Sequence, residues 1–120
     1  MKRKEGNSTT FVLGDMIFEY DEHKNQYNIE RHGISFEYAA RVFFDYDRIE
    51  MYDDENSKNE DRYNTIGSIG GGKGEKGEII FVVYTERIKK VRDGKQLDIT
   101  RLISARIATT FERGIYYGKY

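Results

Sequence analysis

The chain has 120 residues, a length that suits one domain, and 38% of them are apolar, with ten tyrosines and seven phenylalanines to fill a core. It has no cysteine, which excludes disulfides, thiol nucleophiles and cysteine-based zinc sites, and its net charge of −1 does not by itself indicate a nucleic-acid binder. The longest apolar run, residues 79–84, is far below the roughly 20 residues that cross a bilayer, and no apolar segment follows the basic start, so we expect a cytoplasmic protein.

The first half of the chain predicts one strand followed by a helix. Residues 1–10 show no periodicity, so we expect a loose extension ahead of a single domain over residues 11–120. A strand is expected at residues 17–20. Asp21 is suited to cap a helix that ends at His32, because Gly33 can then adopt the left-handed conformation after it.

A second helix is expected to begin after Ser35, which is a good N-cap. The spacing i, i+3, i+4, i+7 of its apolar residues forms one stripe that we interpret as core. These residues are Phe36, Ala39, Ala40 and Phe43.

The second half of the chain predicts four strands and a last helix. The expected strands are residues 48–52, 62–69, 79–84 and 97–106. The glycine-rich residues 70–77 lead into a strand and not into a helix, so we interpret them as a hairpin connection and reject a nucleotide-binding loop. Asp93-Gly94 marks another hairpin turn, and Thr109 with Glu112 forms a capping box that opens the last helix.

This order of elements predicts an α+β fold. Strands joined by short turns favour an antiparallel sheet. The two early helices cannot bury their apolar stripes against each other alone, so we expect them to pack on one face of the sheet.

Two charged blocks stand out along the chain. Residues 45–62 hold eight acidic side chains against three basic ones, which we interpret as solvated loops and faces. Residues 79–120 hold nine basic against four acidic side chains. For this basic block, a solvated face and a surface that binds a polyanion are equally consistent with the sequence.

One face of the first predicted helix carries a possible proton-transfer site. Lys24, Asn28 and His32 lie at i, i+4 and i+8, with Arg31 beside them. A cation, an amide and an imidazole in one row could hold a phosphate and move a proton near neutral pH. The simpler interpretation is a solvated helix face, and helical spacing alone favours it.

The last two predicted strands carry a second group of polar residues, which are Tyr84, Glu86, Arg87, Arg101, Ser104 and Arg106. Arginine binds phosphate through two parallel hydrogen bonds and stabilises negative charge. Arg101 and Arg106 are five residues apart, so a regular strand points them to opposite faces unless a bulge intervenes. Arg62, on the preceding strand, could reach the same surface. For any one arginine, a surface salt bridge is the commoner role.

Classical hydrolytic sites are not indicated. Ser104 and the two histidines form no serine-hydrolase signature, and His23 and His32, nine residues apart, match no metal-binding pattern. We therefore expect neither a bound metal nor a cofactor.

A series of short motifs resembles the BrnT family of type II toxins, in the family's order and over most of residues 18–117. The motifs are FEYD (18–21), Lys24, Asn28, RHGISFEYA (31–39), VFFD (42–45), DRYNTIG (61–67), FVVYTER (81–87) and RLISARIAT (101–109). The chain departs from the usual pattern at Arg31 and Ile107, where lysines are common, and the second change removes a charge.

The resemblance implies a RelE-like fold, with a twisted, mainly antiparallel sheet of four to five strands, two N-terminal helices packed on it and a C-terminal helix. It implies a metal-independent endoribonuclease that inhibits translation and arrests growth. It also implies neutralisation by a BrnA-like antitoxin, whose ribbon-helix-helix part binds operator DNA, so that the toxin reaches DNA only through this partner.

Within that resemblance the polar residues gain roles. His32 is expected to transfer a proton, while Lys24, Arg62 and Arg106 bind or stabilise the phosphate. The expected RNA-binding residues are Arg31, Asn28, Tyr84, Arg87 and Arg101. Tyr84 could stack on a base or position the phosphate.

Two other functions stay open at this point. The chain could be a non-catalytic member that binds its antitoxin and acts as a transcriptional co-repressor, which the near-neutral charge and the missing lysine at Ile107 favour modestly. A plain RNA-binding domain without a partner is the third hypothesis.

Overall fold

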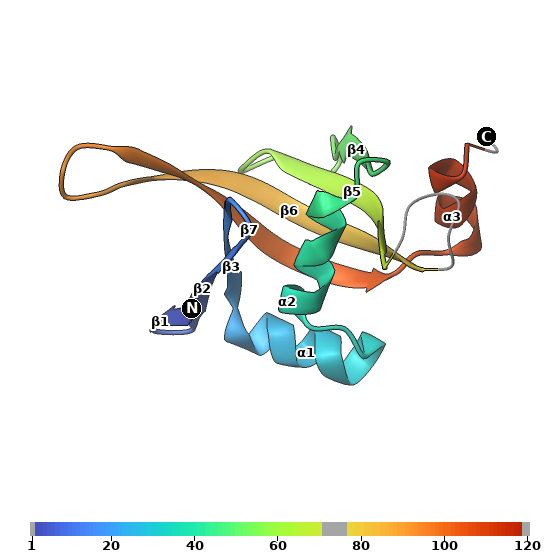
Figure 1. Cartoon of the computed structure of the whole chain (residues 1–120), viewed down its shortest axis with the longest axis horizontal. Coiled ribbons are helices and arrows are strands. Elements are labelled where there is room, and N and C mark those ends of the chain that lie inside the picture. The colour runs from blue at the N-terminus through green and yellow to red at the C-terminus, as the bar shows by residue number, and fades with distance from the viewer. Residues whose placement is uncertain (1, 71–76, 119–120) are drawn as a thin grey trace.

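The structure, a computed structural model, describes residues 2–70 and 77–118 and has the α+β architecture that the sequence predicts (Figure 1). Its strands are β1 (Lys2–Glu5), β2 (Ser8–Leu13), β3 (Met16–Asp21), β4 (Ile49–Tyr52), β5 (Arg62–Ile69), β6 (Glu78–Lys90) and β7 (Gln96–Ile107). Its helices are α1 (Glu22–His32), α2 (Phe36–Ala39), the 3₁₀ helix η1 (Ala40–Phe44) and α3 (Thr110–Tyr116). None of the helices in the described ranges is long and apolar enough to cross a membrane.

The seven strands form one mixed sheet in the order β1-β2-β3-β7-β6-β5-β4. Every neighbouring pair is antiparallel except β3 and β7, where Ile17 to Glu19 lie parallel to Ile99 to Arg101. The mainly antiparallel sheet is therefore confirmed, but the expected count of four to five strands is too low. The parallel pair arises because α1, α2 and η1 separate β3 from the later strands and carry the chain across the sheet.

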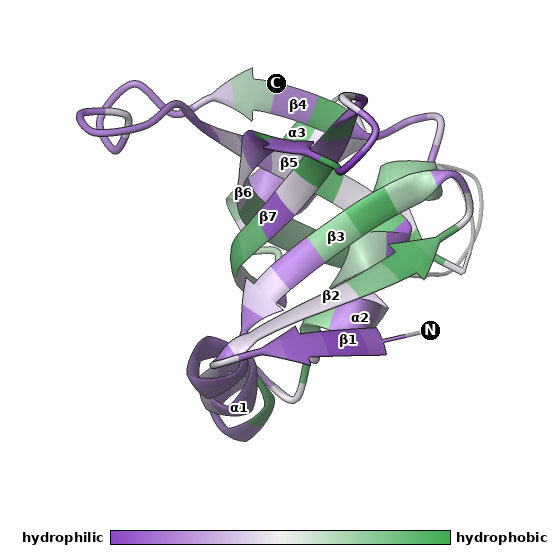
Figure 2. Cartoon of the chain, turned by 90° about the vertical axis from the view of Figure 1, so that its left-hand side faces the viewer, coloured by the Kyte–Doolittle hydropathy of each residue, from purple (hydrophilic) through white to green (hydrophobic). Residues whose placement is uncertain are grey.

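The additional strands are β1 and β2, which begin within residues 1–10, the segment that we expected to be a loose extension, and β2 continues to Leu13. Thr9 is buried although residues 1–10 lack an apolar pattern, and Phe11, directly after that segment, is buried in the core. The Thr9 hydroxyl donates to Glu22 over 2.5 Å, and the Glu22 amide donates to the Asn7 carbonyl over 2.7 Å. Contacts to α1 thus order this hairpin, whereas β1 itself is hydrophilic and exposed at the sheet edge (Figure 2).

Strands β6 and β7 are longer than predicted and continue beyond Arg62, the first residue of β5, as a two-stranded arm (Figure 1). The arm turns at Gly94, whose φ of +84° favours glycine, as the Asp93-Gly94 signal predicts. The central part of the predicted glycine-rich connection between β5 and β6, residues 71–76, lies outside the described residues.

The predicted helix ends agree closely with the structure. Gly33 follows α1 with a φ of +69°, and Ser35 Oγ accepts a hydrogen bond from the Tyr38 amide at the start of α2. Both hydrogen bonds of the Thr109–Glu112 capping box are present in α3. The second predicted helix is tighter than expected, because it changes from α2 to the 3₁₀ helix η1 at Ala40.

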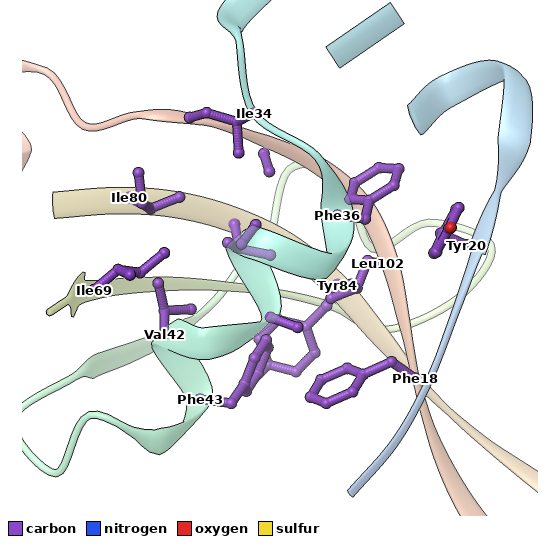
Figure 3. Close-up of a cluster of buried hydrophobic side chains, with 14 of the residues drawn as sticks. Phe18, Tyr20, Ile34, Phe36, Val42, Phe43, Ile69, Ile80, Tyr84 and Leu102 are labelled. Atoms are coloured by element: carbon purple, nitrogen blue, oxygen red, sulfur yellow. The ribbon is translucent and has the colours of Figure 1, made fainter. Parts of the chain in front are cut away.

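Aromatic side chains fill the core between the sheet and the helical segment that joins β3 to β4 (Figure 3). Phe18 is fully buried, with ring-centroid distances of 5.3 Å to Phe11 and 5.4 Å to Phe43. Ile80 and Val82 of β6 point into the same core. We call this side of the sheet the helix-covered face.

Candidate active site on the opposite sheet face

The face opposite the helix-covered face carries the arginines that the sequence singled out. Because Ile80, Val82 and Tyr84 point toward the helices, the residues between them in β6 point to the other side. Thr85 is on that side, and its cross-strand partners are Arg62 in β5 and Arg101 in β7. We call this surface the arginine face.

A bulge in β7 places Arg101 and Arg106 on the same face. Val83 lies opposite Ser104, but Tyr84 lies opposite Leu102, so Ile103 is one extra residue in β7. The partners of the two arginines, Thr85 and Phe81, are four residues apart in β6 and therefore share a face. The structure thus settles the alternative that the five-residue spacing left open.

Ion pairs join three arginines of this face into a chain of alternating charges. Arg101 Nη1 lies 3.1 Å from Glu19 Oε1, and Arg87 Nη1 lies 3.5 Å from the same oxygen. Arg87 Nη2 then lies 3.4 Å from Glu60, whose other oxygen lies 3.7 Å from Arg62. We call this network, Arg101–Glu19–Arg87–Glu60–Arg62, the charge chain. Its members come from β7, β3, β6, the loop before β5, and β5.

Two polar atoms beside the charge chain have no internal partner. Arg62 Nε and Asn64 Oδ1 are buried and make no hydrogen bond within residues 2–70 and 77–118. Both belong to β5 and point to the arginine face, because they pair with Thr85 and Val83. A buried polar group without a partner costs about 1–3 kcal/mol, so this position favours an incoming group that can complete its hydrogen bonds.

A cavity of about 440 Å³ adjoins the charge chain at the start of β5, where the arm of β6 and β7 begins. Its lining includes the Glu60 and Arg87 side chains of the charge chain, together with Thr85 and Ile99. Thr85 Oγ1 donates to the Asp61 carbonyl over 2.6 Å, which fixes the start of β5 against β6. The face therefore has a recess next to its positive groups.

Arg106 is held separately from the charge chain. Its two amino groups donate to the two Glu112 carboxylate oxygens over 2.7 and 2.9 Å, and its guanidinium lies 4.3 Å from the Phe81 ring centre. The hydrogen bond to Glu112 raises the pKa of Arg106. Burial would raise the pKa of Glu112, but hydrogen bonds from Arg106 and Thr109 outweigh it and lower that pKa. This pair fastens α3 to β7.

Among the described residues, those predicted on α1 make no side-chain hydrogen bond or ion pair with the charge chain. Lys24, Arg31 and His32 are exposed, and within the described part of the chain the side chains of Lys24 and His32 make no hydrogen bond or ion pair. Arg31 lies over the Tyr27 ring at 5.8 Å. Asn28 is buried, and its amide nitrogen has no hydrogen-bond partner among the described residues. Helix α1 packs against β7 and β3, which places this row beside the sheet.

Tyr84 lies on the helix-covered face and not with the arginines. Its ring centre is 4.9 Å from Phe43 and 5.5 Å from Tyr63, and its hydroxyl donates to Glu50 over 3.2 Å. Burial is the main cause that raises the pKa of its hydroxyl. Only 5% of Tyr84 is exposed, so the predicted stacking on an RNA base does not fit this position.

The carboxylates that hold the arginines are not among the residues predicted from the sequence. Alternation in Ile17-Phe18-Glu19-Tyr20 was the available signal for Glu19, because two buried aromatic residues flank it and put it on the other face. No comparable signal marks Glu60, which precedes β5. Among the described residues, no group of three or more histidine, aspartate or glutamate side chains is placed to hold a metal ion.

Comparison with protein families identifies the chain. Residues 20–112 match the family described as the ribonuclease toxin, BrnT, of type II toxin-antitoxin systems. The chain belongs to the BrnT family. The matched span includes α1 and the strands that carry Arg62, Arg87 and Arg101, while β1, β2 and Glu19 precede it. A comparison with curated proteins finds no match.

Proposed function

We propose that this BrnT family member is a ribonuclease toxin that cleaves RNA at the arginine face without a metal ion. The observation that carries the proposal is the pairing of Arg62 and Arg101 with Thr85 from its two sides, which leaves both arginines on one face. Adjacent strands are about 4.8 Å apart, so the two arginines start from strands about 10 Å apart. Two long guanidinium side chains can close this distance around one phosphate.

The RNA itself supplies the nucleophile in this mechanism. The ribose 2′-oxygen attacks the neighbouring phosphorus, and the bond to the leaving 5′-oxygen breaks. Arg62 and Arg101 stabilise the negative charge that develops on the phosphate oxygens. His32 donates a proton to the leaving oxygen, and the exposed Lys24 and Arg31 of α1 bind neighbouring phosphates. Arg106 supports this surface through its contact with Glu112.

A purified protein can test this proposal with RNA in the presence of a metal chelator. We expect the wild-type chain to cut RNA, and Arg62→Gln or Arg101→Gln to lower the rate by about 10²–10³-fold, as the loss of one charge-stabilising donor does. Arg3→Gln is the matched control, because Arg3 is exposed in β1 and pairs only weakly with Glu5 at 3.8 Å. Equal rates for all three variants would contradict the assignment of the face.

We also propose that RNA cleavage inhibits translation and arrests growth in the cytoplasm. Induced expression of the wild type should stop growth of a bacterial host, whereas His32→Ala at equal soluble level should not. Arrest by both proteins would keep the toxin function and remove His32 from the mechanism.

The proposed partner is a BrnA-like antitoxin that covers the arginine face and binds operator DNA through a ribbon-helix-helix part. Charged groups would then meet across the interface, so we expect the affinity to fall steeply with ionic strength. Titration of the two proteins at low and at high salt measures this. An affinity that hardly changes would exclude the arginine face as the main contact.

One observation favours a second function, that of a non-catalytic co-repressor. Arg62, Arg87 and Arg101 are already paired with carboxylates, which compete with RNA phosphate for the same donors. In that case the chain would bind antitoxin and strengthen operator binding, and the wild type would cause no growth arrest. Cleavage of RNA by the purified wild type excludes this alternative.

A further inference from the structure

Glu19 is the less exposed of the two carboxylates in the charge chain. Its side chain is 17% exposed, against 36% for Glu60, which lies before β5 and not within a strand. The parallel pairing of β3 with β7 puts Glu19 directly beside Arg101, and Thr10 of β2 lies on its other side. The backbone of the sheet therefore fixes this carboxylate next to Arg101, on the β3 side of the arginine face.

The two oxygens of Glu19 have different surroundings. The closest approaches of Arg101 and Arg87 are both to Oε1, at 3.1 and 3.5 Å. Among the described residues neither Glu19 oxygen accepts a hydrogen bond, because Arg101 donates to Ser8 and Arg87 to Glu60, and Oε2 is not the nearest oxygen to either arginine. One oxygen is thus anchored by two cations, while the second remains able to accept a proton from a bound molecule.

We propose that Glu19 is a catalytic residue that accepts the proton of the attacking ribose 2′-hydroxyl. The inference rests on the proposed RNA cleavage at the arginine face. In the step, the 2′-O–H proton moves to Glu19 Oε2, the 2′-oxygen forms a bond to phosphorus, and the bond from phosphorus to the 5′-oxygen breaks. The leaving oxygen takes its proton from His32, so the products are a 2′,3′-cyclic phosphate and a 5′-hydroxyl.

The position of Glu19 suits this role better than those of the two other carboxylates that pair with arginines of this face. Glu112 uses both oxygens on Arg106, and Glu60 bridges Arg62 and Arg87 through two different oxygens. A base must come within hydrogen-bond reach of the proton that it removes. Glu19 is beside Arg101, which holds the reacting phosphate in the proposed mechanism, and it keeps an oxygen free of hydrogen bonds from the described residues.

Glu19→Gln tests the inference, because it keeps the size of the side chain and removes its basicity. Single-turnover cleavage measures the chemical step, and binding of a 2′-O-methylated RNA of the same sequence measures affinity without cleavage. We expect the cleavage rate to fall at least about 100-fold, as for loss of a general base, with affinity equal to or tighter than that of the wild type. Tighter binding is expected because a negative charge leaves a phosphate-binding surface.

Glu37→Gln is the matched control, because Glu37 also pairs with a cation, Lys2, and accepts a hydrogen bond from Tyr20. Glu37 lies in α2, so the Glu37→Gln variant should cleave RNA as the wild type does. Glu19→Asp keeps the charge and shortens the side chain, so it serves if the glutamine variant does not fold. It should retain affinity and lose rate.

The outcomes separate the inference from the proposed function. A wild type that cleaves RNA while Glu19→Gln keeps more than a tenth of its rate would overturn the role of Glu19 alone. Equal losses of rate and affinity would also overturn it, because Glu19 would then only position Arg101. A folded wild type without cleavage would overturn both proposals.

Discussion

The two faces of the sheet use the same strands for opposite purposes. On the helix-covered face, aromatic and aliphatic side chains from β2, β3 and β6 pack against the helices and are almost fully buried. On the arginine face, the intervening residues of β3, β5 and β7 form alternating ion pairs that are partly exposed. Alternation along each strand thus separates the main core from the charge chain, while a second buried cluster of Ile66, Ile79, Ala108 and Tyr116 packs on the other side of the sheet near α3. Substitutions in the main core and in the charge chain should have separable effects.

The largest loss of stability is expected on the helix-covered face at Phe18. Phe18→Ala removes a fully buried ring between Phe11 and Phe43, which should cost about 3–5 kcal/mol of unfolding free energy. Val12→Ala is the matched change on the other side of the neighbouring strand, where 55% of the residue is exposed, and it should stay within about 0.5 kcal/mol. Urea unfolding measures both. Similar losses would show that the two faces do not differ in this way.

A smaller loss is expected where a helix approaches β5 most closely. A Cβ atom added to Gly67 would lie 2.8 Å from Val42 Cβ and 3.1 Å from the Val42 carbonyl oxygen. Gly67→Ala therefore forces η1 and β5 apart and should cost about 1–3 kcal/mol. Thermal unfolding checks this value, and a variant as stable as the wild type would mean that η1 can move without loss of packing.

The fold was more predictable from the sequence than the site was. Caps and turns at Ser35, Gly33 and Asp93-Gly94 depend on local chemistry, so their positions were predicted correctly. The hairpin of β1 and β2 was missed because its order depends on contacts with α1. The parallel pairing of β3 with β7 is likewise a long-range property.

The candidate site was predictable as a set of arginines but not as an arrangement. Arg62, Arg87 and Arg101 were named from their residue type and strand positions, and they do share one face. Their common orientation depends on long-range strand register, because Arg62 and Arg101 both pair with Thr85, and the bulge that adds Arg106 to this face is marked by no sequence feature. Their carboxylate partners come from other strands or loops, so spacing along the chain could not reveal them.

The pair that joins α3 to the sheet should make part of the stability depend on pH. Because the pKa of Glu112 is lowered in the folded chain, its ion pair stabilises fully above the ordinary carboxyl pKa and is lost as the pH falls through the folded value. Glu112→Gln should cost about 1 kcal/mol near neutral pH, a modest value because Arg106 is 36% exposed, and the difference should shrink in acid. Urea unfolding at neutral and at acid pH measures this difference, with Glu5→Gln in β1 as the control. A difference that is constant with pH would contradict the pairing.

The smallest effect is expected at Glu60, which neutralises part of the arginine face without supporting the core. Its ion pairs with Arg62 and Arg87 are partly exposed, and such pairs are worth about 0.2–1 kcal/mol. If RNA phosphate must displace this carboxylate, Glu60→Gln should tighten RNA binding by up to about fivefold. The salt dependence of binding should also become steeper, because two cations are freed for phosphate. Weaker binding would mean that Glu60 orders the arginines for RNA, and the charge chain would then act as a preformed site and not as a competitor.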